Sequence, residues 1–197
     1  DLSDPSAPTL QASLKIPGFS TYMHPIGDTH LLTIGREADS NGIVTGLKLS
    51  LFDVADATAP RLAHEHIIND PSVVSEALHE HKAFSYFPAQ SLLAVPLSTY
   101  RCDQSGFVGL RALNVDLQSG FQVLADLSHS AFYPPSTLPY CGYSGYADVR
   151  RSLRIEDHLY VLSGKAVTAH PLADLTAPAT ASVTLPDPRP AGDAWLW

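Results

Sequence analysis

The sequence has few cysteines, few basic residues and no long apolar run. Its 197 residues include two cysteines and one methionine, and 20 acidic against 12 basic residues give a formal net charge of −8. No basic stripe is present that could neutralise phosphates, so we do not expect a nucleic acid partner. The longest apolar runs have about five residues, whereas a membrane-spanning helix needs about 20, so we expect no transmembrane segment.

The chain also lacks the patterns that mark common enzyme sites. It has no Ser-His-Asp order, nucleophile elbow, phosphate-binding loop or nucleotide fingerprint. Cys102 and Cys141 form neither a CxxC motif nor a zinc-binding pattern. Because the chain starts inside a repeated motif, we expect a processed or truncated start, and the lack of a signal peptide does not argue against export.

A short acidic turn that ends in Ala-Pro recurs along the chain. It reads DLSDPSAP at residues 1–8, DVADATAP at 53–60 and PLADLTAP at 171–178, with a degenerate copy, NVDLQSG, at 114–120. The copies are spaced by roughly 50 to 60 residues, with short β-rich runs between them. A strand-built repeat of this length predicts an all-β protein, specifically a β-propeller built of four-stranded antiparallel blades.

Aligning the copies divides the chain into three blades, at 19–67, 79–127 and 148–185, preceded by an orphan outer strand at 9–16 and followed by a tail at 186–197. The acidic turn would join the third strand of a blade to the fourth, because Asp bonds to nearby backbone and Pro ends pairing. Residues 72–84 have mixed periodicity that also suits a helix; since the repeat requires a strand there, we expect a loop followed by a strand. The expected strands are 19–25, 30–34, 46–53 and 61–67, then 79–86, 91–96, 107–115 and 121–127, then 148–155, 158–163, 166–171 and 179–185.

Three blades do not close a ring, because propellers have about four to eight. An open arc would leave unpaired sheet edges and bare apolar faces. We therefore expect residues 1–197 to be the C-terminal part of a single β-propeller domain. Missing sequence of the same precursor, or other copies of the chain, would complete the ring. We also expect the Trp-Leu-Trp end at 195–197 to pack against another surface.

The strand directions of an antiparallel blade place its loops on two rims. The tight-turn rim holds the first-to-second and third-to-fourth turns. The long-loop rim holds the second-to-third turns and the links between blades, at 35–45, 69–78, 97–106 and 128–147, and long loops on a rigid scaffold are where binding concentrates. Cys102 and Cys141 fall in neighbouring loops of this rim, which predicts a disulfide bond; two buried intracellular thiols are the alternative.

The loop at 37–45 has the spacing of a calcium-binding loop. Oxygen ligands would come from Glu37, Asp39, Asn41 and the carbonyl of Ile43, with a glycine at the sharp turn. The twelfth position is Lys48, where a bidentate Glu is usual. Ca²⁺ is therefore one hypothesis for a cofactor, and a solvated turn rich in Asx hydrogen bonds is the alternative.

The residues on and before the inner strands are unusually polar, and in a propeller they line the central channel. Converging charges in a narrow pore could bind an anion or a metal, or perform acid–base chemistry. The alternative, which we favour, is a network of paired charges that locks the blades together. The channel-lining candidates are Tyr22, His24, Glu76, His81, Lys82, Asp148, Arg150 and Arg151.

Two His-Glu-His triplets, at 64–66 and 79–81, could each offer two imidazoles to Zn²⁺ or Cu²⁺ from one side of a strand. No cysteine or third histidine is tied to either triplet by spacing. One triplet falls on an expected outer strand and the other on an inner strand. We therefore interpret these residues as partly exposed histidines.

A resemblance to a known family rests on six segments, at 15–22, 24–27, 46–54, 75–78, 81–84 and 148–153. Through these segments the chain resembles a family of exported bacterial and archaeal proteins with a C-terminal β-propeller domain, distantly like WD repeats. The segment at 79–80 departs from the aromatic-acid pair of that family. The resemblance implies a longer exported precursor and brings no activity or catalytic residue.

These observations favour a non-enzymatic binding or scaffold propeller at or outside the cell envelope. It would recognise a protein or another ligand through the long-loop rim. The alternatives are an enzyme with a metal- or anion-assisted site in the channel, and a purely structural repeat.

Overall fold

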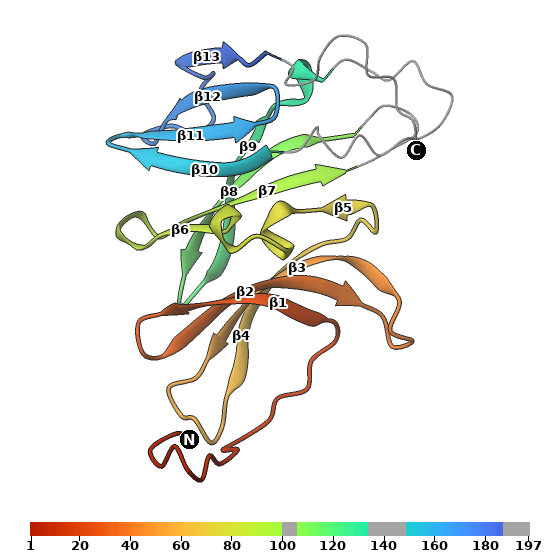
Figure 1. Cartoon of the computed structure of the whole chain (residues 1–197), viewed down its shortest axis with the longest axis vertical. Helices are drawn as coiled ribbons and strands as arrows, with labels where there is room; N and C mark the ends of the chain where they lie inside the picture. Colours follow the sequence, from red (N-terminus) through yellow and green to blue (C-terminus); the bar gives the residue numbers. More distant parts are fainter. Residues whose placement is uncertain (100–105, 134–148, 187–197) are drawn as a thin grey trace.

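Three antiparallel β-sheets are stacked one on another in the part of the chain that the structure describes (Figure 1). The structure is a computed structural model, and it describes residues 1–99, 106–133 and 149–186. Within those ranges no helix is long and apolar enough to cross a membrane. The sheets are called A, B and C in chain order.

Sheet A contains four strands in sequence order: β1 (Phe19–Ile26), β2 (His30–Ala38), β3 (Val44–Asp53) and β4 (Arg61–Ile68). Every neighbouring pair is antiparallel, which is the meander that the repeat predicted. The backbone of β1 comes very close to Gly35 of β2, because a Cβ added at Gly35 would stand 1.9 Å from the carbonyl oxygen of Phe19. Only glycine allows this close backbone approach.

Sheet B is the least regular. Its main path is β5 (Val73–Val74), β7 (Leu92–Thr99), β8 (Val108–Asp116) and β9 (Gly120–Ser128), and β6 (Ser85–Phe87) also pairs with β7. Sheet C repeats the meander with β10 (Val149–Ile155), β11 (His158–Ser163), β12 (Ala166–Pro171) and β13 (Ala181–Thr184).

The sheets stack with a constant polarity. Thr29, Ser91 and Asp157 hold the same place in sheets A, B and C, because the carbonyl of each accepts a hydrogen bond from a residue next to the last residue of the third strand. In sheets B and C, the side chains that face the preceding sheet come two and four residues after these positions. Leu93 and Val95 belong to the core between A and B, and the equivalent Leu159 and Val161 belong to the core between B and C.

Aliphatic side chains fill both interfaces. Between A and B, Leu32, Ile34 and Leu49 are fully buried. Between B and C, smaller side chains such as Ala94 and Ala112 pack against Leu159. Burying such surface is the main favourable contribution to the stack.

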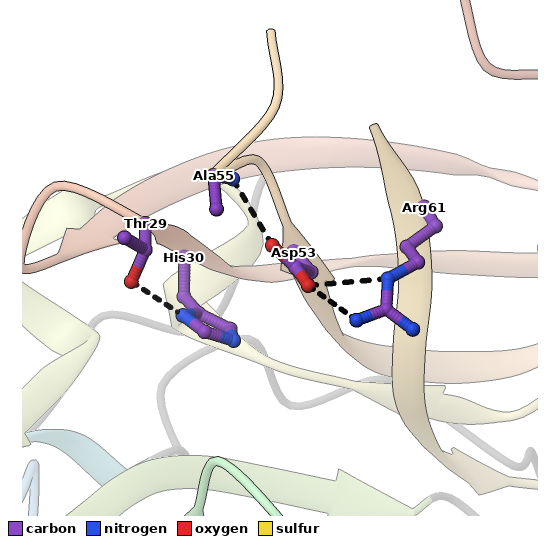
Figure 2. Close-up of polar contacts among 5 residues, drawn as sticks. All are labelled: Thr29, His30, Asp53, Ala55 and Arg61. Atoms are coloured by element: carbon purple, nitrogen blue, oxygen red, sulfur yellow. Dashed lines mark hydrogen bonds and ion pairs between the residues drawn. The ribbon is translucent and has the colours of Figure 1, made fainter. Parts of the chain in front are cut away.

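The recurring acidic turn has the hydrogen bonds expected of it. Asp53 Oδ1 accepts from Ala55 N at 3.0 Å, and Arg61 Nε and Nη2 donate to its Oδ2 at 3.1 and 2.6 Å, while Thr29 Oγ1 lies 2.9 Å from His30 Nδ1 on the neighbouring turn (Figure 2). Three residues further on, Asp56 Oδ1 accepts from the amide and hydroxyl of Thr58 at 2.9 and 2.6 Å. The side chain of Asp174 makes the same two bonds with Thr176.

The strand expected at 79–86 is wrong for most of its length. The structure has the 3₁₀ helix η1 (Glu76–Leu78) just before this range. Within the range it has the 3₁₀ helix η2 (His81–Ala83), followed by the short β6. Ser75 Oγ accepts from Ala77 N at 3.2 Å, and Glu80 Oε1 accepts from Lys82 N at 2.9 Å. Such local side-chain-to-backbone bonds compete with strand pairing and begin helical turns instead.

Two other expectations about local structure differ from the structure. Residues 9–16, expected as an outer strand, form no strand. The loop expected at 35–45 is shorter, because β2 continues to Ala38 and β3 begins at Val44. The pairing of β2 with β3 includes Glu37 opposite Gly46 and ends with Ala38 opposite Val44, with an irregular register between Glu37 and Ala38.

Candidate functional site at the inner strands

Tyr22 and His24 lie together on β1 and face sheet B. Tyr22 Oη is 3.2 Å from His24 Nδ1. The ring of Phe84 lies 5.1 Å from that of Tyr22, and the ring of Tyr86 lies 5.8 Å from that of His24, between centroids. Both candidates are half-buried, and burial lowers the pKa of His24. The arrangement is an aromatic cluster between the first two sheets.

Glu76 and Arg150 form an ion pair that joins sheet C to the helical turn of sheet B. Arg150 Nη1 donates to Glu76 Oε1 at 3.0 Å, and the side chains are 44% and 28% exposed. Nearby, Ser85 Oγ donates to the carbonyl of Ser152 at 3.4 Å. A pair that is this exposed contributes little to stability. It links β10 of sheet C to η1 next to sheet B.

The remaining channel candidates do not gather at this pair. His81 and Lys82 are exposed in η2, and Arg151 is exposed on β10. Glu80 accepts from the Lys82 amide, which with the nearby charges of His81, Lys82 and Arg151 lowers the Glu80 pKa. Asp148 lies outside the described residues. Within the described ranges, no group of three His, Cys, Asp or Glu side chains could hold a metal ion.

The side chains of Glu37 and Asp39 and the carbonyl of Ile43, three of the candidate calcium ligands, have protein partners. Asp39 Oδ1 accepts from the amides of Asn41 and Ile43 at 2.9 Å each, and the Ile43 carbonyl accepts from Asp39 N at 2.9 Å. Glu37 is drawn into the sheet instead, with its Oε2 2.5 Å from Lys48 Nζ. These are the Asx hydrogen bonds of the alternative interpretation, and calcium binding by this loop stays a prediction.

The histidines of the first His-Glu-His triplet face the outer strand of sheet B. The His66 ring lies 6.2 Å from that of Phe121, and a Cβ at Gly120 would stand 2.8 Å from Cγ of His64. Burial lowers the pKa of His66. These imidazoles therefore belong to the interface between β4 and β9, whereas the second triplet lies in the turns around η2.

The predicted Cys102–Cys141 disulfide lies outside the described residues. The described ends of the two loops that carry these cysteines are adjacent. His129 N donates to the carbonyl of Val108 at 2.7 Å, and Val108 N donates to Ser130 Oγ at 3.0 Å. Phe107 N donates to Thr99 Oγ1 at 2.9 Å, which closes the base of the first loop.

Sequence reasoning missed a buried polar network around His129, in the link from sheet B to sheet C. His129 is 0% exposed. Its Nδ1 is 2.9 Å from Ser163 Oγ on β11, and its Nε2 is 2.8 Å from Thr168 Oγ1 on β12. Thr168 Oγ1 also lies 2.9 Å from His170 Nε2. One sequence signal was present: Thr168 and His170 alternate on one side of a short strand.

One arrangement of protons satisfies every donor in this network. His170 Nε2–H donates to Thr168, whose hydroxyl donates to His129 Nε2; His129 Nδ1–H donates to Ser163, whose hydroxyl donates to the Ala166 carbonyl at 3.2 Å. The reverse direction would put a proton on His170 Nδ1, which has no hydrogen-bond partner among the described residues. His129 is therefore neutral, and burial together with His170 lowers its pKa to about 4.

The fold and these contacts agree with a comparison to known families. A family model described as "Beta propeller domain" matches residues 1–175. The chain therefore belongs to the beta propeller domain family, as the four-stranded sheets and their stacking indicate.

The printed titles of two archaeal relatives both begin "Uncharacterized protein". One, from Archaeoglobus fulgidus, is 26% identical over 170 residues, which cover 86% of this chain and 22% of the relative. The other, from Methanocaldococcus jannaschii, is 39% identical over 69 residues, which cover 35% of this chain and 10% of the relative. The chain thus spans less than a quarter of the length of either relative.

Proposed function

We propose that this chain is part of a non-enzymatic β-propeller module that acts at or outside the cell envelope. It binds a protein or another ligand through its long-loop rim. The observation that carries the proposal is the contrast between the two rims of the stack.

The tight-turn rim uses its polar groups internally. The carboxylates of Asp53, Asp56 and Asp174 accept hydrogen bonds from nearby amides, hydroxyls and an arginine. Asp116 does the same, accepting from the amides of Gln118 and Ser119 at 2.9 and 2.7 Å. At least one oxygen of each of these carboxylates is thus occupied within its own or the adjoining turn, which reduces the hydrogen-bonding capacity left for a partner.

The long-loop rim has a rigid base, and one of its loops presents an exposed aliphatic side chain. Arg36 Nη1, near the end of β2, donates to the carbonyl of Val73 at 2.6 Å and so ties the rim ends of sheets A and B together. Ile43, in the loop between β2 and β3, is 64% exposed. The joined ends of the loops near Val108 and His129 lie on the same rim by strand direction. A fixed frame that presents loops is the usual basis of a binding surface.

A pair of matched substitutions tests which rim binds. Ile43→Asp alters the long-loop rim, and Ile155→Asp alters an equally apolar site on the tight-turn rim, where the side chain is 53% exposed. Each tagged protein is incubated with solubilised envelope fractions, and the components bound are quantified by mass spectrometry. We expect Ile43→Asp to reduce capture about 10-fold, which corresponds to 1.4 kcal/mol, and Ile155→Asp to leave it unchanged. Equal effects of the two variants, or no specific capture by the unsubstituted protein, would contradict the proposal.

Export is tested separately, by fractionating cells that express the complete natural gene and probing each fraction with an antibody to this domain. We expect the signal in the envelope or the medium. Recovery with cytoplasmic markers would contradict this part of the proposal and leave the rim test standing.

A further inference from the structure

The N-terminal segment folds as the turn between a third and a fourth strand, although no third strand lies beside it in the part of the chain that the structure describes. In sheet A, Asp53 at the end of β3 pairs with Arg61 at the start of β4, and this is the pair nearest to the turn. At the N-terminus Asp1 and Thr9 occupy the same positions, and they are already paired: Thr9 N donates to Asp1 O at 3.0 Å, and Asp1 N donates to Thr9 O at 2.6 Å. The first rung of a strand ladder is therefore formed.

The side-chain bonds of this turn also match. Ser3 N donates to Asp1 Oδ1 at 2.8 Å, as Ala55 N does to Asp53 at 3.0 Å. The amide and hydroxyl of Ser6 donate to Asp4 Oδ1 at 3.0 and 2.7 Å. The bonds of Thr58 to Asp56 are 2.9 and 2.6 Å long. The turn is thus the same structure as the one that joins β3 to β4.

Residues 9–16, which follow this turn, have the pattern of a strand. Leu10, Ala12, Leu14 and Ile16 alternate with polar residues, a period of two that is typical of a strand with one buried face. In the structure Leu10 is 87% exposed and Leu14 is 42% exposed, whereas Ala12 and Ile16 are partly buried. Large aliphatic side chains at alternate positions indicate a strand without its neighbours.

We infer that residues 9–16 are the outer strand of a further propeller sheet and pair, antiparallel, with a third-type strand supplied from outside the described residues. Such a strand has alternating aliphatic side chains and ends just before the acidic turn, as β3 does. A second folded copy of the chain has none to offer, because β3, β8 and β12 of the described sheets are each paired with a fourth strand. The partner is therefore a sheet that lacks its own outer strand.

The position of this further sheet follows from β4. His64 and His66 of β4 face sheet B, where they meet Gly120 and Phe121. Ala12 and Leu14 are the equivalent residues of the N-terminal segment, so their row would face sheet A. Directly after the segment, the Pro17 carbonyl accepts from Lys48 Nζ at 2.5 Å, on the side of sheet A that sheet B does not cover. This hydrogen bond therefore holds the end of the segment on the face of sheet A where the further sheet would pack.

The experiment supplies the missing strands covalently. A second copy of residues 19–52 is placed directly before Asp1, so that the junction repeats the natural Phe52–Asp53 step. Amide hydrogen exchange is then compared in the extended and original chains. We expect exchange at residues 9–16 to slow at least about 10-fold in the extended chain, because paired amides exchange only when the sheet opens.

Leu14→Pro provides the matched control, since proline cannot take part in a strand ladder. In the original chain it should leave the unfolding midpoint unchanged, whereas in the extended chain it should abolish the new protection. Two results would overturn the inference. One is exchange at residues 9–16 that is equally fast with and without the extension. The other is loss of protection in β4 (Arg61–Ile68), which would show that the added strand had displaced β4 instead.

Discussion

The imidazole of His129 bridges the link before sheet C to two strands inside it, with its Nδ1 2.9 Å from Ser163 Oγ. The other ring nitrogen, Nε2, is hydrogen-bonded to Thr168 Oγ1, so both ring nitrogens make buried hydrogen bonds. The two contacts span 34 and 39 residues of sequence. The link from sheet B is thereby fastened to the core of sheet C.

Replacing His129 by alanine should destabilise the protein by about 3 kcal/mol, because the change leaves a cavity and removes the partner of two buried hydroxyls. Urea unfolding measures the loss. His158→Ala is the matched control, since His158 is bonded only to the neighbouring exposed Asp157 among the interactions described. Equal losses in the two variants would show that the network does not contribute specially.

The same residue predicts a dependence of stability on pH. The folded-state pKa of His129 is about 4, below the ordinary 6.5, so the unfolded state binds its proton first. The stabilisation is complete above about pH 6.5 and falls between pH 6.5 and 4, by roughly 3 kcal/mol in total. His170, whose pKa burial also lowers, adds a contribution of the same sign.

Urea unfolding at several pH values between 7.5 and 4 measures this dependence. The slope should be steeper in the natural protein than in His129→Asn, which cannot titrate. Parallel curves would show that His129 is not neutral in the folded state.

The acidic turns predict a second pH effect, at lower pH. Hydrogen bonds from Thr58 lower the pKa of Asp56, so its contribution is present above the unfolded pKa and is lost as pH falls through the folded one. At neutral pH, Asp56→Ala should lower the melting temperature by a few degrees, whereas Asp56→Asn keeps an acceptor oxygen and should stay close to the natural value. Asp28→Ala, at an exposed turn position, serves as the control. Equal melting temperatures for the alanine and asparagine variants of Asp56 would disprove the role of its side-chain oxygen.

Lys48 is buried on sheet A with its Nζ 2.5 Å from Glu37 Oε2, and the two side chains are 3% and 15% exposed. Lys48→Met should cost about 3 kcal/mol, because it leaves the Glu37 carboxylate buried without a counter-charge. The double variant Glu37→Gln/Lys48→Met should recover most of that loss. Chemical denaturation of the single and double variants measures the coupling, and additive losses would show that the pair does not interact.

Much of the fold was predictable, because local chemistry repeats with it. The side chains of Asp56 and Asp174 make the same turn wherever the motif occurs, and the strands between the turns alternate clearly. The turns at η1 and η2 were not predictable from the repeat, because the side chains of Ser75 and Glu80 accept hydrogen bonds from the amides two residues further on and so begin helical turns.

The site was harder to predict than the fold. Glu76 and Arg150 were both named as channel-lining candidates, but their pairing depends on how sheets B and C meet, and Glu76 lies in η1 instead of on a strand. His129 was missed because a single histidine after an outer strand carries no local sign of its partners. Both contacts arise from tertiary packing over long sequence separations, which no window of neighbouring residues records.

The constant polarity of the stack has a consequence for how such proteins change in length. Each sheet offers one kind of face to its predecessor and another kind to its successor, and the chain passes between equivalent acidic turns at matching points. A gene segment cut at two of these turns therefore encodes a unit whose two surfaces fit the neighbours on either side. Duplication or deletion of that unit preserves every interface type, so members of different size can arise by recombination without new packing having to evolve.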